Sequence, residues 1–170
     1  MSQKFIETSM ESQKGGMTMD FKISELLSKE AVILELKAKE KMLVIQELAE
    51  HLVNKNLIVN KDEFLTAIAK RENLESTGIG NGIAIPHART NAVKNLVLAF
   101  GRSDDGVDFS SIDGRPSHLI FMIVSPEEKK SEYIKTLAKI SRLVRKEEVR
   151  AMLRNAKDPH EIMEIIKTNE

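Results

Sequence analysis

A glycine-rich run that ends in a Pro-His pair constrains the fold of this chain more than any other segment. Gly78, Gly80 and Gly82 alternate with other residues and lead into a short apolar stretch that ends at Pro86 and His87. Glycine tolerates backbone angles and close approaches that other residues cannot adopt, and successive N–H groups in such a turn can point into one concavity and bind an anion. The run therefore predicts a tight turn, a short strand and, beside them, a histidine able to carry or transfer a phosphoryl group.

The composition limits the classes of function that fit this histidine. A chain of 170 residues suffices for one domain with a hydrophobic core. Its 26 basic and 26 acidic residues balance, so no net charge draws it to nucleic acid or to an anionic membrane. The absence of cysteine excludes disulfides, thiol catalysis and zinc–thiolate sites.

The distribution of apolar residues along the sequence indicates where the protein is located and how many domains it has. No apolar run approaches the ~18 residues that a membrane span needs, and the N-terminus lacks the apolar core of a secretory signal. We therefore expect a cytoplasmic protein without membrane insertion. Residues 1–20 are polar and predict a flexible leader, followed by a single domain over residues 21–170.

The order of apolar patterns predicts an α/β fold. Apolar runs are typical of buried strands, which we expect at 31–36, 83–85, 96–100 and 118–124. Amphipathic or capped segments predict helices, which we expect at 23–27, 38–56, 60–73, 129–145, 146–155 and from 159 onward. The strand at 118–124 is nearly all apolar and should be central, and 104–116 predicts a loop or loose hairpin. Strands and helices mixed on this scale indicate a three-layer α/β/α sandwich.

Helix starts and buried helix faces follow from local patterns. Asn60 with Glu63 resembles a capping box, and Asp158 followed by Pro159 and Glu161 marks another helix start. In two long helices the period of 3.6 residues selects side chains that should face the core. These are Met42, Ile45, Leu48, Ala49 and Leu52 in the first, and Ile134, Leu137, Ala138 and Val144 in helix 129–145.

His87 and Arg71 are the first candidates for chemistry. Many histidines near strand ends are hydrogen-bonded structural residues, but a nearly neutral imidazole is also a competent nucleophile at cytoplasmic pH. Pro86 fixes the backbone before it and removes a competing donor. Arg71 lies sixteen residues earlier, and its planar guanidinium suits the charge that spreads over three oxygens during phosphoryl transfer. The alternative for Arg71 is a solvated arginine at a helix end.

Other polar residues near the run have two interpretations each. The hydroxyls of Ser76 and Thr77 either contact phosphate or stabilise the turn, and Arg89 either meets phosphate or an acidic partner or is a solvated loop residue. The basic residues from Arg142 to Arg150 have acidic residues interspersed among them, which is typical of a solvated face.

Several motifs that would indicate other chemistry are missing from the sequence. The remaining histidines are scattered without H-x-x-x-H spacing, which argues against a metal site. The chain has no G-x-S-x-G elbow and no G-x-x-x-x-G-K-[ST] loop, so it is not expected to be a serine hydrolase or a P-loop NTPase.

The run from Ser76 to Ala88 resembles the active-site signature of the type-2 IIA domains of the bacterial phosphoenolpyruvate-dependent sugar phosphotransferase system. This family includes the fructose/mannitol-type IIA components and a nitrogen-regulatory branch. The resemblance covers about residues 22 to 168. Supporting segments are Leu36-Lys37-Ala38-Lys39, Arg71-Glu72, Val107-Asp108-Phe109 and Ile112-Asp113-Gly114. It implies an α/β/α sandwich around a small mixed sheet, and no metal or organic cofactor.

The resemblance also implies roles for individual residues. His87 matches the residue that receives a phosphoryl group from phospho-HPr as a phosphohistidine and passes it on, typically to a IIB domain. Arg71 matches the family's active-site arginine. From the residues themselves, we expect Thr77 and the N–H groups of the turn at Gly80 and Gly82 to support the phosphate. Tyr133 stands where many members carry a second active-site histidine. A neutral phenol donates a hydrogen bond to phosphate, so transfer rate or phosphohistidine lifetime is expected to differ.

Two functions are compatible with this family. The chain is expected to be a phosphocarrier IIA component in fructose/mannitol-type sugar uptake. The alternative is a stand-alone nitrogen-regulatory-type protein that binds and regulates partners according to its phosphorylation state. Intact His87 and Arg71 argue against a third possibility, a degenerate interaction domain. The sugar, the acceptor and the oligomeric state stay open.

Overall fold

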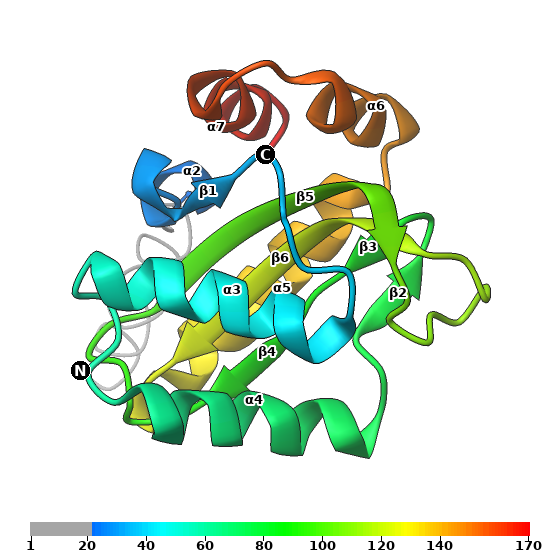
Figure 1. Cartoon of the computed structure of the whole chain (residues 1–170). Helices are drawn as coiled ribbons and strands as arrows, with labels where there is room; N and C mark the ends of the chain where they lie inside the picture. Colours follow the sequence, from blue (N-terminus) through cyan, green and yellow to red (C-terminus); the bar gives the residue numbers. More distant parts are fainter. Residues whose placement is uncertain (1–21) are drawn as a thin grey trace, which may run out of the picture.

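A mixed sheet lies between two layers of helices in the computed structural model, which describes residues 22–170 (Figure 1). The predicted leader at residues 1–20 lies outside the described residues. The three-layer α/β/α architecture expected from the sequence is confirmed. Within residues 22–170, no helix has both the length and the apolar character to cross a membrane.

The sheet is organised around one central strand that is buried along nearly its whole length. Two parallel partners, one after the other along the chain, share one edge of that strand, and an antiparallel partner occupies its other edge. Across the sheet the strands are β1 (Val32–Ile33), β5 (Val97–Val107), the central β6 (Ser117–Ser125), β3 (Ile83–Ala84) and β2 (Gly78–Gly80), with β4 (His87–Arg89) also paired to β6. A strand covered by helices on both faces is expected to be apolar throughout, and this accounts for the uninterrupted apolar run at 118–124.

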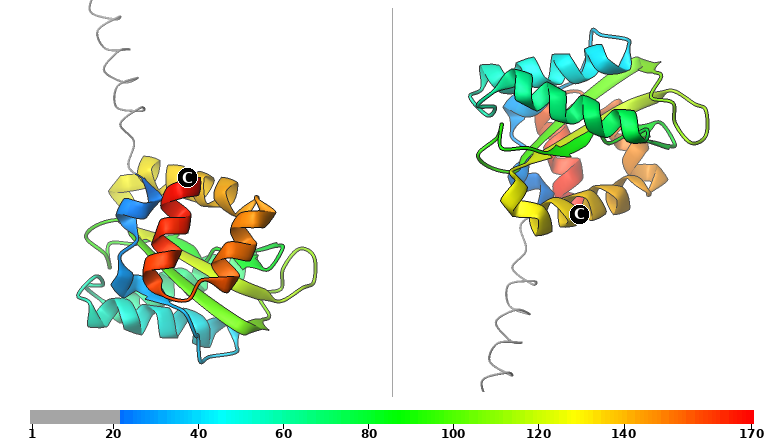
Figure 2. Two further views of the ribbon diagram at one scale, coloured as in Figure 1. Left: turned by 90° about the horizontal axis from the view of Figure 1, so that it is seen from above. Right: turned by 90° about the horizontal axis from the view of Figure 1, so that it is seen from below.

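The helices divide between the two faces of the sheet (Figure 2). One layer holds α3 (Lys41–Asn54) and α4 (Lys61–Leu74). The other layer holds α2 (Ile23–Leu26), α5 (Lys130–Val144), α6 (Glu147–Asn155) and α7 (Pro159–Asn169). Two short 3-10 turns, η1 (Lys29–Ala31) and η2 (Glu127–Lys129), join strands to helices. The helix α4 of the first layer, the strand β4, and η2 with α5 of the second layer together form the site described below.

The predicted helix caps are present. Asn60 Oδ1 accepts a hydrogen bond from the Glu63 N–H at 3.0 Å, and Asp158 Oδ1 accepts one from the Glu161 N–H at 2.8 Å. The Glu63 carboxylate does not complete a capping box, because it accepts a hydrogen bond from Thr90 Oγ1 (3.3 Å) instead.

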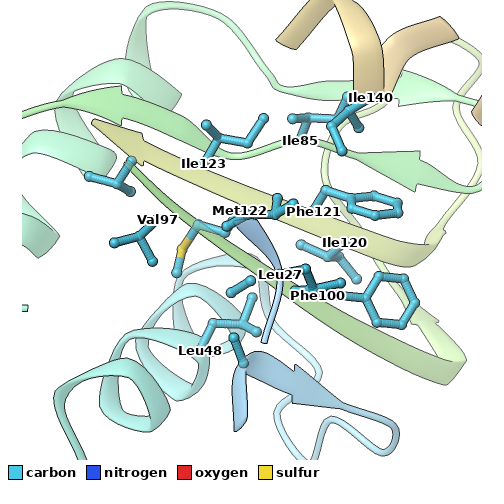
Figure 3. Packing of buried hydrophobic residues seen from close by; sticks show 14 of the residues in the cluster. Leu27, Leu48, Ile85, Val97, Phe100, Ile120, Phe121, Met122, Ile123 and Ile140 are labelled. Carbon is cyan, nitrogen blue, oxygen red and sulfur yellow. The ribbon is translucent and has the colours of Figure 1, made fainter. Parts of the chain in front are cut away.

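Aliphatic and phenylalanine side chains fill the space between the sheet and both helical layers. Leu48 of α3 lies on one side of the central strands and Ile140 of α5 on the other (Figure 3). Phe100 and Phe121 are paired across β5 and β6, with ring centroids 5.0 Å apart in an edge-to-face arrangement. Such aromatic pairs add to the stability that their buried area provides.

The strand expected at 31–36 is much shorter in the structure. Only Val32–Ile33 pairs with β5, and the backbone N–H groups of Lys37 and Ala38 donate to the Glu47 carboxylate at 2.8–3.1 Å. A side chain of α3 thus replaces a neighbouring strand as hydrogen-bond partner. In contrast, β5 extends seven residues beyond Phe100, so that the first part of the expected 104–116 loop is strand.

The prediction that three particular side chains lie in the core is wrong, because all three are exposed. Met42 is 40% exposed, Ile134 is 53% exposed and Ala138 is exposed as well. The buried face of α5 begins with Tyr133 and Thr136, so a search for aliphatic residues alone placed that face incorrectly.

Candidate functional site

The position of His87 follows from the pairing of β4 with the central strand. His87 lies opposite Ile123 in parallel register, and the Pro86 carbonyl accepts a hydrogen bond from the Ile123 N–H at 3.0 Å. The ring nitrogen Nδ1 is 2.6 Å from the Ile85 carbonyl oxygen. Because a carbonyl only accepts hydrogen bonds, Nδ1 carries the proton and Nε2 keeps its lone pair. The backbone thus selects the imidazole tautomer with a nucleophilic Nε2.

An open groove of about 810 Å³ contains this histidine. The helix α4 forms one wall, β4 the floor, and η2 with α5 the other wall. Three cations line the groove with His87 and Tyr133, namely Lys70, Arg71 and Arg89, and the acidic residues of the lining are Glu63 and Glu127. A groove with several cations around one neutral nucleophile is suited to bind a phosphoryl group.

Backbone carbonyls hold both arginines at the rim of the groove. Arg71 Nη1 donates to the Glu75 carbonyl oxygen at 2.9 Å, just beyond the end of α4. Arg89 Nη1 donates to the Glu127 carbonyl oxygen at 3.3 Å. A guanidinium has five N–H donors, so each arginine retains donors for a bound anion.

Tyr133 occupies the side of the groove opposite α4. Its ring centroid is 5.9 Å from that of His87, and the two rings are tilted by 50°. Burial raises the pKa of the Tyr133 hydroxyl, and the positive charges of Arg71 and Arg89 partly oppose that shift. The phenol therefore stays protonated at neutral pH and acts as a hydrogen-bond donor.

Four influences act on the pKa of His87. Burial of the ring lowers it most, the bond to the Ile85 carbonyl raises it, Arg71 lowers it, and Glu72 raises it. The net effect is a pKa below the usual 6.5. The imidazole is therefore mainly neutral at pH 7, and the neutral form is the nucleophilic one.

Glu72 and Thr77 form a buried support behind the histidine. Glu72 is 6% exposed, and its carboxylate accepts hydrogen bonds from Thr77 Oγ1 (2.6 Å) and Thr77 N (3.1 Å). Lys41 Nζ pairs with the same carboxylate at 3.1 Å. The Thr77 carbonyl accepts from the Ile85 N–H at 3.0 Å, and Ile85 in turn holds His87. Thr77 thus stands behind the groove, not in its lining.

Sequence reasoning named Glu72 only as part of a matching segment and gave it no role. A usable signal was present, since Phe64, Ile68 and Glu72 follow one another at intervals of four along the buried face of α4. A carboxylate at a core-facing position is almost never left unpaired.

The structure does not bring Gly80 and Gly82 to the groove. They form the β2–β3 turn with positive φ angles of 90° and 78°, and the Asn81 N–H between them donates to Asp113 Oδ2 at 2.9 Å. Gly82 precedes the residue that pairs with Leu119, whereas His87 is opposite Ile123. At about 3.3 Å per residue, Gly82 and His87 are roughly 16 Å apart along the sheet. Their predicted phosphate contact therefore does not fit this geometry.

The part of the chain that the structure describes contains no group of three histidine or carboxylate side chains able to hold a metal ion. The groove around His87 offers cations and hydrogen-bond donors, which are ligands for an anion.

The fold and this groove define an α/β/α domain with a histidine in an anion-binding groove, and comparison with known proteins identifies its family. Residues 25–169 match the family described as phosphoenolpyruvate-dependent sugar phosphotransferase system, EIIA 2. The chain belongs to this family.

Individual relatives come from both branches of the family. The chain is 42% identical over 149 residues to the fructose-specific EIIABC component of Bacillus subtilis. The matched segment covers 88% of this chain but only 24% of that relative. The nitrogen regulatory protein IIA-Ntr from Neisseria meningitidis superposes with a TM-score of 0.79 at 29% identity, covering 85% of this chain and 98% of that one. The mannitol IIA in a complex with phosphorylated IIB from Escherichia coli has the same fold (TM-score 0.72, 22% identity, 84% and 97% covered).

Proposed function

We propose that this chain is a phosphocarrier that accepts a phosphoryl group from phospho-HPr on Nε2 of His87 and passes it to a IIB domain. The observation that supports it most is the 2.6 Å bond between His87 Nδ1 and the Ile85 carbonyl. That bond fixes the proton on Nδ1 and leaves the Nε2 lone pair in a groove lined by arginines.

The transfer step is a displacement at phosphorus in which Nε2 of His87 is the nucleophile. The Nε2 lone pair forms a bond to phosphorus while the bond from phosphorus to the donor breaks and leaves its electron pair on the donor. Phosphorylated His87 then carries a positive ring, whose Nδ1–H stays bonded to the Ile85 carbonyl. The three equatorial oxygens gain charge in the transition state, and Arg71, Arg89 and the Tyr133 hydroxyl are the groove's donors for them.

The acceptor and substrate are inferred from relatives. The B. subtilis relative is a fructose-specific EIIABC component, and the E. coli mannitol IIA is recorded with phosphorylated IIB. We therefore assign this chain to fructose/mannitol-type uptake in the cytoplasm. Its similarity to IIA-Ntr over 98% of that protein supports a second candidate, a regulator that binds partner proteins according to the phosphorylation state of His87.

The first test is intact-mass analysis after incubation with phosphoenolpyruvate, enzyme I and HPr. Wild type should gain one acid-labile phosphoryl group, and His87→Ala should gain none while keeping its fold. His160→Ala is the matched control, because His160 is exposed at the start of α7, and it should be modified like wild type. Phosphorylation of folded His87→Ala would refute the assignment.

A second measurement separates the two candidate functions. Phosphorylated protein is mixed with a fructose-type IIB domain and the phosphoryl group on each protein is followed by mass. Rapid transfer to IIB supports the role in uptake. Stable phosphoprotein in the presence of IIB supports the regulatory function.

A further inference from the structure

A second groove, of about 430 Å³, lies at the other end of the sheet from His87. The turn at Asn81 and Gly82 forms one side, and α6 forms the opposite side. Figure 1 shows α6 and the β2–β3 strands at the same end of the molecule. The glycine turn of the signature therefore borders this second groove.

Positive charge dominates the lining of this second groove. Arg115, from the loop between β5 and β6, lines the groove together with Arg150 and Arg154 of α6, and Glu147 is the acidic residue of the lining. None of the salt bridges within residues 22–170 involves these arginines. Asp113 lies nearby, and backbone N–H groups of Asn81 and Arg115, with a smaller effect of the Arg115 charge, lower the pKa of its carboxyl. The formal charge of the lining arginines, Glu147 and Asp113 together is still positive. A concave surface of this charge attracts an anion.

Arg150 is held in place before any ligand binds. Its Nη1 donates to the carbonyl oxygens of Val144 (2.8 Å) and Arg145 (3.0 Å) at the end of α5. The remaining N–H groups of the guanidinium are left for another acceptor. A side chain that is already ordered loses less conformational entropy when it binds a ligand.

His118 adds a group of a different kind to the lining. Its Nδ1 is 2.9 Å from the Ser103 carbonyl oxygen, so Nδ1 carries the proton and Nε2 is an acceptor in the neutral ring. An acceptor beside three arginines suits a ligand that has a hydroxyl group as well as a negative charge. Inorganic hydrogen phosphate also carries an O–H group, but it is small for a groove of about 430 Å³.

We propose that this second groove binds the phosphate monoester of a small hydroxylated metabolite. A phosphate monoester carries a charge of about −1.5 to −2 at pH 7 and accepts the paired hydrogen bonds that guanidinium groups donate. The groove's volume falls within the ~300–1,000 Å³ of small-molecule sites, which leaves space for a sugar-sized body beyond the phosphate. The site is roughly 16 Å from His87 along the strands, so it is separate from the phosphoryl-transfer groove and does not depend on the proposed function.

The test combines calorimetry with amide chemical shifts on the full chain, using glucose 6-phosphate as the probe. We expect a dissociation constant below about 1 mM, with shifts at the Asn81 and Gly82 amides. Inorganic phosphate should bind at least about tenfold more weakly because it lacks the contacts of the sugar body, and unphosphorylated glucose should do so because it lacks the negative charge.

Two arginine variants test the residues. The side chains of Arg115 and Arg154 are exposed, so Arg115→Gln/Arg154→Gln should fold normally and bind the probe at least about tenfold more weakly. Arg142→Gln is the matched control, because Arg142 is also exposed but lies on α5 outside the groove lining. It should bind like wild type. His87→Ala should also bind like wild type, which excludes the first groove as the site.

Several outcomes would overturn the proposal. These are no binding of glucose 6-phosphate, equal binding by Arg115→Gln/Arg154→Gln, or shifts confined to the residues around His87. Equal affinity for inorganic phosphate would contradict the metabolite, because the sugar would then add nothing.

Discussion

At the scale of single residues, two charged neighbours act on the pKa of His87 in opposite directions. Arg71 lowers it and Glu72 raises it, while burial sets the overall decrease. Both residues belong to the end of α4, so consecutive positions in the sequence adjust the same imidazole. The tautomer itself is set by a third contact, the Ile85 carbonyl.

This opposition predicts a pair of pKa shifts. The wild-type imidazole should titrate below 6.5. Arg71→Gln should raise that pKa, because a positive neighbour is lost, and Glu72→Gln should lower it, because a negative one is lost. An NMR titration of the His87 ring measures all three. His160 is exposed, and its ring resonances in the same spectra should not move between variants. Shifts of equal sign in the two variants would contradict the arrangement.

The lowered pKa also fixes the sign of the contribution of His87 to stability. The unfolded chain binds the proton more tightly than the folded one, so this contribution is fully present above the unfolded pKa of about 6.5. It decreases as the pH falls from that value through the folded pKa, because protonation then favours the unfolded state. Acceptance of phosphate should weaken over the same range, since the protonated ring has no free lone pair.

At the scale of elements, helix ends determine where functional side chains lie. Asn60 begins α4, which places Arg71 and Glu72 three turns later beside the groove. Asp158 begins α7 in the opposite layer, and α7 contributes no residue to the His87 groove. Both caps use the same bond from a side-chain oxygen to a backbone N–H.

Removal of either cap should therefore reduce stability without an effect on chemistry. Asn60→Ala and Asp158→Ala should each lower the free energy of unfolding by about 1 kcal/mol, measured by urea denaturation. The rate of phosphorylation at 25 °C should stay at the wild-type value, because neither residue lines the groove. Asp158→Asn is the control and should retain most of the stability, since asparagine is an equally good cap. A large loss of rate in Asn60→Ala with normal stability would contradict this separation.

At the scale of the whole molecule, the sequence predicted elements better than their boundaries or orientation. Every expected helix is present, and β6 is central as its apolar run indicated. The shortening of β1 was not predictable, because it depends on a bond from Glu47, ten residues away, to the backbone. The buried face of α5 was predicted incorrectly because its first two buried residues are Tyr133 and Thr136, which are not aliphatic.

In the candidate site too, features set by neighbouring residues can be predicted from the sequence, whereas features set by the packing of distant elements cannot. The tautomer of His87 depends on a contact two residues away, but the meeting of Arg71, Arg89 and Tyr133 depends on the packing of α4 and α5 around β4. The glycine turn was assigned to the phosphate because it is close to His87 in sequence. In an extended strand, however, each residue between the turn and His87 adds about 3.3 Å to the distance between them.

The glycine turn supplies the test of this placement. Gly82 has φ +78°, and an added Cβ would meet only His118 Cδ2 at an ordinary 3.6 Å. Gly82→Ala should thus cost roughly 1–2 kcal/mol of stability through its left-handed backbone angle, read from urea denaturation. Phosphorylation of His87 should proceed at the wild-type rate, because the turn is distant from the imidazole. If Gly82→Ala folds but loses phosphoryl acceptance, the glycines hold the phosphate and the groove beside Arg71 and Tyr133 is not the complete site.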